Sequence, residues 1–184
     1  MKRAFDIVVA LGALALLSPL MLATAAAVLL DTGPPALFRQ RRVGLGGREF
    51  GMYKFRSMVA NAEAIGSFQT AANDARITRV GGFIRRSSLD ELPQLFNVLK
   101  GDMSIVGPRP DVPAQRSLYS DREWAERCSV RPGITGLAQA LLRSSGTEAE
   151  RLALDLRYVR ERSLWLDLRI MGMTFKRLSG QDAN

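Results

Sequence analysis

The chain has 184 residues, and 26 lysines and arginines against 18 aspartates and glutamates give it a formal net charge of +8. This length is enough for one domain with a real core, and the charge favours anionic partners such as phosphorylated small molecules, nucleic acid or an acidic membrane face. The absence of histidine excludes Ser-His and Cys-His catalytic pairs and histidine-ligated metal sites. The single cysteine, Cys128, excludes an internal disulfide and is typical of a reducing compartment.

A long uncharged segment lies near the N-terminus, since no residue from Ile7 to Leu30 carries a charge. As one helix it would be roughly 36 Å long, more than the roughly 30 Å hydrocarbon core of a bilayer. A cleaved signal peptide, a membrane-spanning helix and a re-entrant helix that enters and returns are all compatible with it. The signal peptide fits least well, because the apolar run continues past the candidate cleavage site at Ala23–Ala25.

Basic residues at both ends of this segment favour the re-entrant form. Lys2 and Arg3 precede it, and several arginines follow from Arg39 onward. A single crossing cannot place both basic flanks on the cytoplasmic side, whereas a helix that turns back can. Ser18 and Pro19 lie near the middle, where proline removes a helical hydrogen bond and the serine hydroxyl can satisfy the freed carbonyl. A kinked spanning helix is the alternative that these residues leave open.

The rest of the chain predicts a small body of short strands and helices. In chain order we expect a connector at 31–38, a strand at 48–58, a helix ending at Gly66, a loop leading into a helix near 80, a helix at 92–101, an extended segment with a rigid turn at 103–110, a loop at 131–139, and amphipathic helices at 147–162 and 163–178. The apolar face of the helix at 92–101 would comprise Leu92, Leu95, Phe96 and Leu99, and that of 147–162 Leu152, Leu156 and Val159. The helix at 163–178 suits either a membrane interface or the core.

Two adjacent acids, Asp90 and Glu91, stand where a helix is expected to begin. Pro93 cannot donate a backbone hydrogen bond, so it belongs in the first turn and places the helix start near Leu89 or Asp90. The acids could simply cap the helix, since Ser88 and Glu91 have the spacing of a capping box. They could also be functional, with an ionised aspartate as nucleophile beside a carboxylate that binds a metal or handles a proton.

Cations that suit a phosphate ligand lie close to the acid pair in the sequence or in nearby segments: Lys54, Arg56, Arg85, Arg86 and Arg109. Arg109 stands between two prolines, and the residue before a proline is held out of the α region. A guanidinium held in this way is a good bidentate ligand for phosphate. Each of these cations, taken alone, is typical of a solvated surface. The prediction of a phosphate-binding site therefore depends on their occurrence together.

At this point the sequence resembles the bacterial sugar transferases, the monotopic phosphoglycosyl transferase family, in a minimal single-domain form. The segments that carry the resemblance are "FRQRRVG", "MYKFRSM", "DARITRVGGFIRRSSLDELPQLFNVLKGDMSIVGPRP", "RPGITGLAQ" and "LDLRYVRERSLWLDLRI". The resemblance implies transfer of a sugar 1-phosphate from a UDP-sugar to undecaprenyl phosphate, the first membrane step of glycan assembly. It implies a Mg²⁺-dependent ping-pong reaction with a covalent aspartyl-phosphosugar intermediate.

The resemblance also assigns roles to residues. Asp90 is expected to be the nucleophile, and Glu91 to assist it, with both as metal ligands. Substrate-binding positions carried over from the family are Lys54, Arg56, Arg85, Arg109, Gln139, Arg143 and Asp155. Ser18 and Pro19 match the family's membrane helix break. The sequence departs from the family's pattern after Gln139, where Leu142, Ser144 and Glu148 replace the usual residues on the sugar side.

The resemblance implies an α+β, mostly helical fold in two parts: a re-entrant membrane anchor at 1–35, built as helix, break and helix, and a cytoplasmic catalytic body at 36–184 with short strands and interfacial amphipathic helices. It would lie on the cytoplasmic face of the bacterial inner membrane, contact lipids and bind no nucleic acid. The alternative is a non-catalytic basic membrane protein that binds nucleic acid or acts as a scaffold. Aromatic residues make up only 7% of the chain, which does not favour a nucleic-acid groove.

Overall fold

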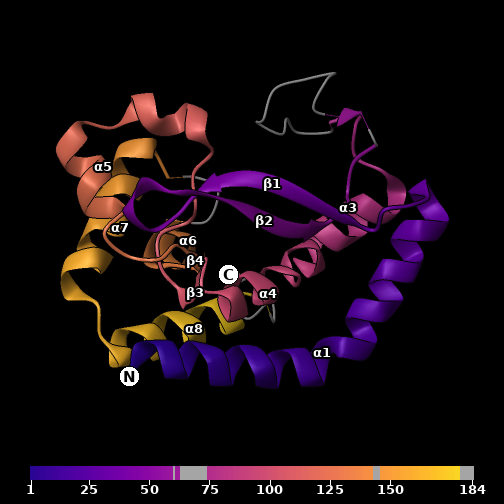
Figure 1. The fold of residues 1–184 in the computed structure, drawn as a ribbon, viewed down its shortest axis with the longest axis horizontal. Coiled ribbons are helices and arrows are strands. Elements are labelled where there is room, and N and C mark those ends of the chain that lie inside the picture. The colour runs from indigo at the N-terminus through magenta and orange to yellow at the C-terminus, as the bar shows by residue number, and fades with distance from the viewer. Residues whose placement is uncertain (60, 63–73, 143–145, 179–184) are drawn as a thin grey trace.

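The computed structural model describes residues 1–59, 61–62, 74–142 and 146–178. This part of the chain is mostly helical with two small sheets, as the predicted α+β class requires (Figure 1). The helices are α1 (Lys2–Thr32), α3 (Arg79–Arg86), α4 (Gln94–Lys100), α5 (Asp121–Arg127), α6 (Leu137–Leu142), α7 (Glu148–Glu161) and α8 (Leu164–Leu178). Short 3-10 turns are η1 (Leu45–Gly47), η2 (Leu89–Glu91) and η3 (Pro113–Leu118), and the strands are β1 (Leu37–Val43), β2 (Glu49–Phe55), β3 (Ser104–Val106) and β4 (Gly133–Thr135).

The apolar N-terminal segment forms a single helix, α1, with Pro19 inside it. Figure 1 shows that this helix changes direction partway along, so the expected break between two helices is a bend within one helix. Pro19 has no N–H to give to the carbonyl of Ala15. The Ser18 hydroxyl donates to that carbonyl oxygen instead, at 3.1 Å. The predicted role of the serine is therefore confirmed, and the bend leaves no orphaned carbonyl at this position.

Both halves of α1 pack against the body, although the helix is long and apolar enough to cross a membrane. In the first half, Ala10 is fully buried in the larger of two hydrophobic clusters, whose other members come from β2, α4, β3 with the preceding Met103, α6, α7 and α8. In the second half, Met21 and Val28 are buried against Phe55 and Ile84 in the smaller cluster. Helix α1 thus completes the hydrophobic core at two separate places.

Charged side chains tie each end of α1 to the body. At the N-terminal end, Lys2 Nζ donates to Asp167 of α8 at 2.7 Å, and Arg3 donates to the last carbonyls of α4, those of Val98 (2.5 Å) and Leu99 (2.9 Å). At the other end, the Arg56 guanidinium donates to carbonyls that follow or close the helix. They are those of Thr32 (3.0 Å), Gly33 and Pro34 (3.3 Å).

Strands β1 and β2 form an antiparallel hairpin in which Leu37 pairs with Phe55 and Val43 with Glu49. Strand β2 confirms the strand expected at 48–58, whereas β1 begins inside the predicted connector and was missed. Most of β1 is half-buried or exposed and rich in arginine, so its sequence lacks a clear apolar alternation. The turn uses Gly46 and Gly47 at positive φ, a conformation that glycine adopts without steric cost.

Strands β3 and β4 form a short parallel pair that brings two distant loops together. Backbones approach so closely that a Cβ on Gly107 would lie 2.4 Å from the Arg131 carbonyl oxygen. A Cβ on Gly133 would lie 2.1 Å from the Gly107 nitrogen. The segment 131–139, predicted to be a loop, contains β4 and the start of α6. Its glycines permit close contact between backbones rather than turns.

The expected helix at 92–101 exists as α4, but its buried face differs from the prediction. Leu95 is buried, whereas Phe96 is 42% exposed and Asn97 is fully buried. Asn97 is satisfied because it accepts from the Tyr53 amide at 2.9 Å and donates to the Gly51 carbonyl at 2.8 Å. The side chain of Asn97, which joins α4 to β2, is therefore buried on this helix, whereas Phe96, which the pattern placed on the buried face, is partly exposed.

The two C-terminal helices form as expected. On α7, Leu156 and Val159 are buried as predicted. On α8, Ile170 is fully buried while Trp165 and Phe175 are 78% and 73% exposed, so this helix has both a core face and an exposed apolar face. Helix α5 was not predicted, and the helix expected to end at Gly66 lies largely outside the described residues.

Candidate active site

The acid pair lies in the 3-10 turn η2, between α3 and α4, and not in the first turn of an α-helix. Helix α4 begins only at Gln94, directly after Pro93. Ser88 precedes the turn with φ 58°, and among the described residues it is the only non-glycine residue at positive φ. Its side chain makes no capping hydrogen bond, so the capping-box interpretation is wrong. A strained backbone that positions two acids is typical of a functional site.

Glu91 is held as an anion by two cations. Its Oε1 accepts from Lys54 Nζ at 2.9 Å and from Arg109 Nη2 at 2.7 Å. Burial alone would raise the pKa of Glu91, but the charges and hydrogen bonds of Arg109 and Lys54 outweigh it and lower the pKa to about 2. A carboxylate with so low a pKa carries no proton near neutral pH, so Glu91 acts as a fixed negative charge.

Asp90 has a different environment although it is the next residue. It is only 7% exposed, and within the described residues its carboxylate has no hydrogen-bond partner. Burial raises the pKa of Asp90, while the charges of Lys54, Arg85 and Arg109 act in the opposite direction. A poorly solvated carboxylate without hydrogen bonds, surrounded by cations, has the properties of a nucleophile toward a phosphorus atom.

Lys54 and Arg85, two cations near the acid pair, come from different elements. Lys54 lies on β2, and burial lowers its pKa even though Glu91 counteracts the effect. Arg85 lies in the last turn of α3, and its Nη1 is 3.5 Å from the Ser57 hydroxyl. We call Asp90, Glu91, Lys54, Arg85 and Arg109 the acid-pair cluster. The hairpin, α3, η2 and the loop after β3 each contribute to it.

Arg109 is held by the backbone of its turn. The carbonyl oxygens of four consecutive residues, 108–111, each accept a hydrogen bond from another part of the chain. The donors, in order, are Gly133 N (2.9 Å), Arg127 Nη2 (2.6 Å), Arg42 Nη1 (2.9 Å) and Val43 N (2.8 Å). The Arg109 side chain itself is 44% exposed, so part of its guanidinium faces solvent while one nitrogen binds Glu91.

Three residues expected to bind substrate, Arg56, Asp155 and Gln139, have partners within the protein. Arg56 is 8% exposed, and its guanidinium donates hydrogen bonds to the carbonyls at the end of α1. Asp155 is buried against Arg127, which donates to it at 3.0 Å, and burial raises the pKa of Asp155 to about 6. The Gln139 amide donates to the Ile134 carbonyl at 3.2 Å, and Arg143 lies outside the described residues.

Three residues near the site were missed by sequence reasoning: Arg42, Asp111 and Arg127. Arg127 pairs with both Asp111 and Asp155, and Arg42 holds the Pro110 carbonyl. Burial lowers the pKa of Arg42 to about 10, and the nearby charge of Arg109 contributes. In the sequence these residues look like ordinary surface charges, and only the fold brings them together.

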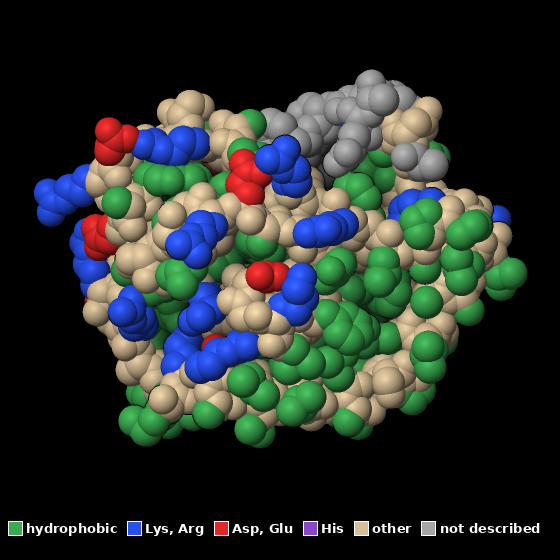
Figure 2. Space-filling view, viewed as in Figure 1, with side chains coloured by type: hydrophobic (Ala, Val, Ile, Leu, Met, Phe, Trp, Pro, Cys, Tyr) green, Lys and Arg blue, Asp and Glu red, His purple; other side chains and the backbone are tan. Residues whose placement is uncertain are grey.

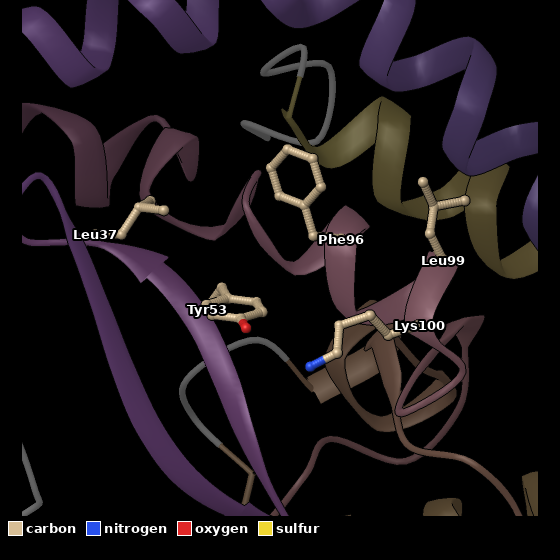
Figure 3. Close-up of a pocket in the computed structure, with 5 residues that line it drawn as sticks. All are labelled: Leu37, Tyr53, Phe96, Leu99 and Lys100. Carbon is tan, nitrogen blue, oxygen red and sulfur yellow. The ribbon is translucent and has the colours of Figure 1, made fainter.

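An apolar groove of about 510 Å³ lies between the hairpin and α4 (Figure 3). Its walls are Leu37 and Tyr53 of the hairpin and Phe96, Leu99 and Lys100 of α4. The Lys100 ammonium lies 5.3 Å from the centre of the Tyr53 ring. Figure 2 shows hydrophobic side chains continuing from the region between hairpin and α1 onto α1 itself.

The acid pair has the donor set of a magnesium site that a substrate completes. Among the described residues, no three acidic, cysteine or histidine side chains are placed so that they could hold a metal ion together. Mg²⁺ commonly binds one or two carboxylates together with substrate phosphates and waters. Asp90 and Glu91 therefore fit a shared Mg²⁺–diphosphate site, and they do not fit a closed site made of protein ligands alone.

Known proteins match nearly the whole of this chain in sequence. The family model for bacterial sugar transferases matches residues 1–181. A UDP-glucose:undecaprenyl-phosphate glucose-1-phosphate transferase of Xanthomonas campestris pv. campestris is 50% identical over 98% of this chain and 39% of its own length. A UDP-N-acetylgalactosamine-undecaprenyl-phosphate N-acetylgalactosaminephosphotransferase of Aeromonas hydrophila is 46% identical over 95% of this chain and 43% of its own length.

A third relative has a length similar to that of this chain. The exopolysaccharide production protein PSS of Rhizobium leguminosarum bv. phaseoli is 43% identical over 93% of this chain and 91% of its own length. The chain belongs to the bacterial sugar transferase family. It spans less than half the length of the first two relatives.

Proposed function

We propose that the protein transfers a sugar 1-phosphate from a UDP-sugar to undecaprenyl phosphate through a covalent intermediate on Asp90. The observation that carries this proposal is the buried Asp90 carboxylate, which has no hydrogen bond from the residues that the structure describes, beside a Glu91 that Lys54 and Arg109 neutralise. The relatives named as transferases of glucose 1-phosphate and of N-acetylgalactosamine phosphate to undecaprenyl phosphate support the same reaction class.

The proposed reaction has two displacements at one phosphorus. In the first, an Asp90 oxygen attacks the phosphorus that bears the sugar, and the bond from that phosphorus to the bridging oxygen breaks so that UMP leaves with the electron pair. In the second, a phosphate oxygen of the acceptor attacks the same phosphorus and Asp90 leaves as a free carboxylate. Neither step requires a protein base, because both nucleophiles are already anions.

The cations have complementary tasks in this proposal. Lys54 and Arg109 sit at Glu91 and would attract the diphosphate, while Arg85 stands near Asp90 and would lower the repulsion between its carboxylate and the incoming phosphate. Mg²⁺, held by Asp90 and Glu91 with the donor, would neutralise further charge on the diphosphate. Glu91 would fix the cations and the metal rather than move a proton.

We also propose that α1 is re-entrant and that the body lies on the cytoplasmic face of the membrane. Both ends of α1 bind the same body through Lys2, Arg3 and Arg56, and both halves pack into its core. A helix that crossed the bilayer would separate these ends. The outward side chains of α1, among them Leu16 and Leu22 at 79% and 72% exposure, would face lipid.

The apolar groove supports a place for the acceptor's lipid tail. An isoprenyl chain is apolar and needs apolar walls, which Leu37, Phe96 and Leu99 provide. Helix α4, which forms one wall of the groove, begins at Gln94, three residues after Glu91. The phosphate of the acceptor could therefore stand at Asp90 while its tail leaves along the groove toward the apolar surface of α1.

The decisive experiment is to supply detergent- or nanodisc-embedded protein with UDP-glucose or UDP-N-acetylgalactosamine, undecaprenyl phosphate and Mg²⁺, and to measure UMP. Wild-type protein is expected to release UMP, and intact-protein mass spectrometry with donor alone is expected to show a phosphosugar adduct. Asp90→Asn should abolish both, because an amide is a very poor nucleophile here. An adduct that survives in Asp90→Asn would place the nucleophile elsewhere.

The groove is tested by separating the two displacements. Phe96→Gln should raise the KM for undecaprenyl phosphate roughly 10-fold, since it removes about 1–3 kcal/mol of apolar contact with the tail. The rate of adduct formation with donor alone should stay unchanged. Phe83→Gln, at another exposed phenylalanine on α3, is the matched control. Equal effects of the two substitutions would exclude the groove as the tail site.

A further inference from the structure

The strongest unassigned feature near the site is a buried ionic network centred on Arg127. Its side chain is 7% exposed and lies at the last residue of α5. The two acids that it pairs with, Asp111 and Asp155, are also buried, with side chains 10% and 7% exposed. One cation therefore faces two anions away from water, an arrangement that persists only when each hydrogen bond is made.

Arg127 uses the three nitrogens of its guanidinium in three different directions. Nε donates to Asp155 on α7 at 3.0 Å, Nη1 donates to Asp111 at 2.5 Å, and Nη2 donates to the Arg109 carbonyl oxygen at 2.6 Å. The Tyr119 ring packs 5.5 Å from the guanidinium carbon. A planar fork is needed to satisfy these positions together, and the ammonium of a lysine cannot reproduce it.

The third of these bonds connects the network to the acid-pair cluster. Arg109 is the residue whose side chain binds Glu91, and its own carbonyl is the one that Arg127 holds. The neighbouring carbonyls are held by other donors, Gly133 N and Arg42 Nη1. Among the four carbonyls of the turn, the one at Arg109 depends on a side chain that is itself fixed by two buried acids.

We propose that Arg127 is a positioning residue that sets the place of the Arg109 guanidinium at the acid pair, and that Asp155 serves the reaction through Arg127 rather than by touching substrate. This inference rests on the proposed function, because it assigns Arg109 to the reacting diphosphate. The buried network transmits the position of α5 and α7 to the turn, and the turn aims Arg109 at Glu91.

The test measures the single-turnover rate of adduct formation with donor alone, where slow variants remain measurable. Arg127→Lys keeps the charge but loses the fork, and we expect the rate to fall ~10- to 100-fold, the cost of a small misplacement at a reacting centre. Arg160→Lys is the matched control, since Arg160 joins the same two helices through Glu126 but touches no part of the turn. It should leave the rate unchanged.

A double-mutant cycle separates positioning from general structural damage. In an Arg109→Ala background, Arg127→Lys should change the rate by less than about twofold, because the group that Arg127 positions is gone. Effects that multiply in the double variant would overturn the proposal, as would an unchanged rate in Arg127→Lys. If Arg127→Lys does not fold, Asp155→Asn takes its place in the same cycle, with a smaller fall expected and the same criterion.

The outcome also distinguishes this inference from the proposed function. If wild-type protein forms no adduct and releases no UMP with any donor offered, the proposed function fails. If wild-type protein is active and Arg127→Lys behaves as Arg160→Lys does, only the positioning role fails.

Discussion

Asp90 and Glu91 are adjacent in the chain but differ in their surroundings. Glu91 receives two charged hydrogen bonds, from Lys54 and Arg109, whereas Asp90 is buried without one in the described part of the chain. The surroundings lower the pKa of Glu91 to about 2 and raise that of Asp90. The 3-10 turn and the left-handed Ser88 direct the two side chains to these different environments. In this way one dipeptide would supply both a fixed charge and the proposed nucleophile.

The low pKa of Glu91 predicts how stability depends on pH. The pKa is lower in the folded protein than in the unfolded chain, where it is near 4.5. The stabilisation is therefore complete above about pH 4.5 and is lost as the pH falls toward about 2. At about 1.4 kcal/mol per pKa unit its upper limit is about 3 kcal/mol.

Urea unfolding of wild-type protein and Glu91→Gln between pH 7 and pH 3 measures this dependence. The stability difference between the two proteins should shrink as the pH falls below about 4.5. Glu161→Gln, on the exposed surface of α7, supplies the baseline. A difference that stays constant across this range would contradict the predicted shift.

Arg56, the residue directly after β2, connects the hairpin to the end of helix α1. Family resemblance placed Arg56 among the substrate-binding residues, but its guanidinium points to the end of α1, where backbone carbonyls have no helical partner. Charged hydrogen bonds to carbonyls are worth about 1.5–3 kcal/mol each when buried. Arg56 therefore binds the end of α1, and Lys54, two residues earlier, binds Glu91 of the acid pair.

Arg56→Met tests this assignment at the level of the element. The substitution keeps much of the side-chain volume but leaves buried carbonyls without donors, so we expect a loss of roughly 2–4 kcal/mol of stability. The donor KM of the folded fraction should remain within about twofold of wild type. Arg41→Met, at an exposed position on β1, is the control. A raised donor KM without a loss of thermal stability would restore the substrate-binding role.

At the scale of the whole molecule, the decisive question is on which side of the membrane the two chain ends lie. Tags at the N-terminus and at the C-terminus should both be protected in intact spheroplasts and both become accessible in inverted vesicles. This outcome is expected because both ends of α1 bind one body. Accessibility of the two tags from opposite sides would refute the re-entrant topology.

Much of the site could be predicted from local sequence, and the packing could not. Ser18 and Pro19 predict the bend as two adjacent residues. The acid pair is followed by Pro93, and Arg109 stands between Pro108 and Pro110, so these predictions needed no tertiary information. Strands β1 and β4 were missed because their residues are selected for charge or for close backbone contact rather than for apolar alternation.

The partners of Arg56 and Asp155 could not be predicted from the sequence for the same physical reason. Arg56 and Asp155 resemble site residues by their place in the motifs, yet their partners, the carbonyls of α1 and the side chain of Arg127, come from elements distant in the sequence. Asn97 is buried because it bonds to β2 across the core. The apolar periodicity of a helix or strand predicts only which of its own residues are buried. It cannot predict which polar groups from distant elements will pair.

The attachment of both ends of α1 to the body has a consequence for how the protein would meet the proposed lipid acceptor. A protein attached to the bilayer at one terminus can rotate relative to the membrane, so the entrance of its groove adopts many orientations. With both ends secured by Lys2, Arg3 and Arg56, the proposed seating of α1 would fix the tilt of the body, and the groove beside α4 would keep a constant height above the leaflet. Encounter with a long-chain acceptor would then be a search in two dimensions, governed by the number of acceptor molecules per unit area of membrane and not by their bulk concentration.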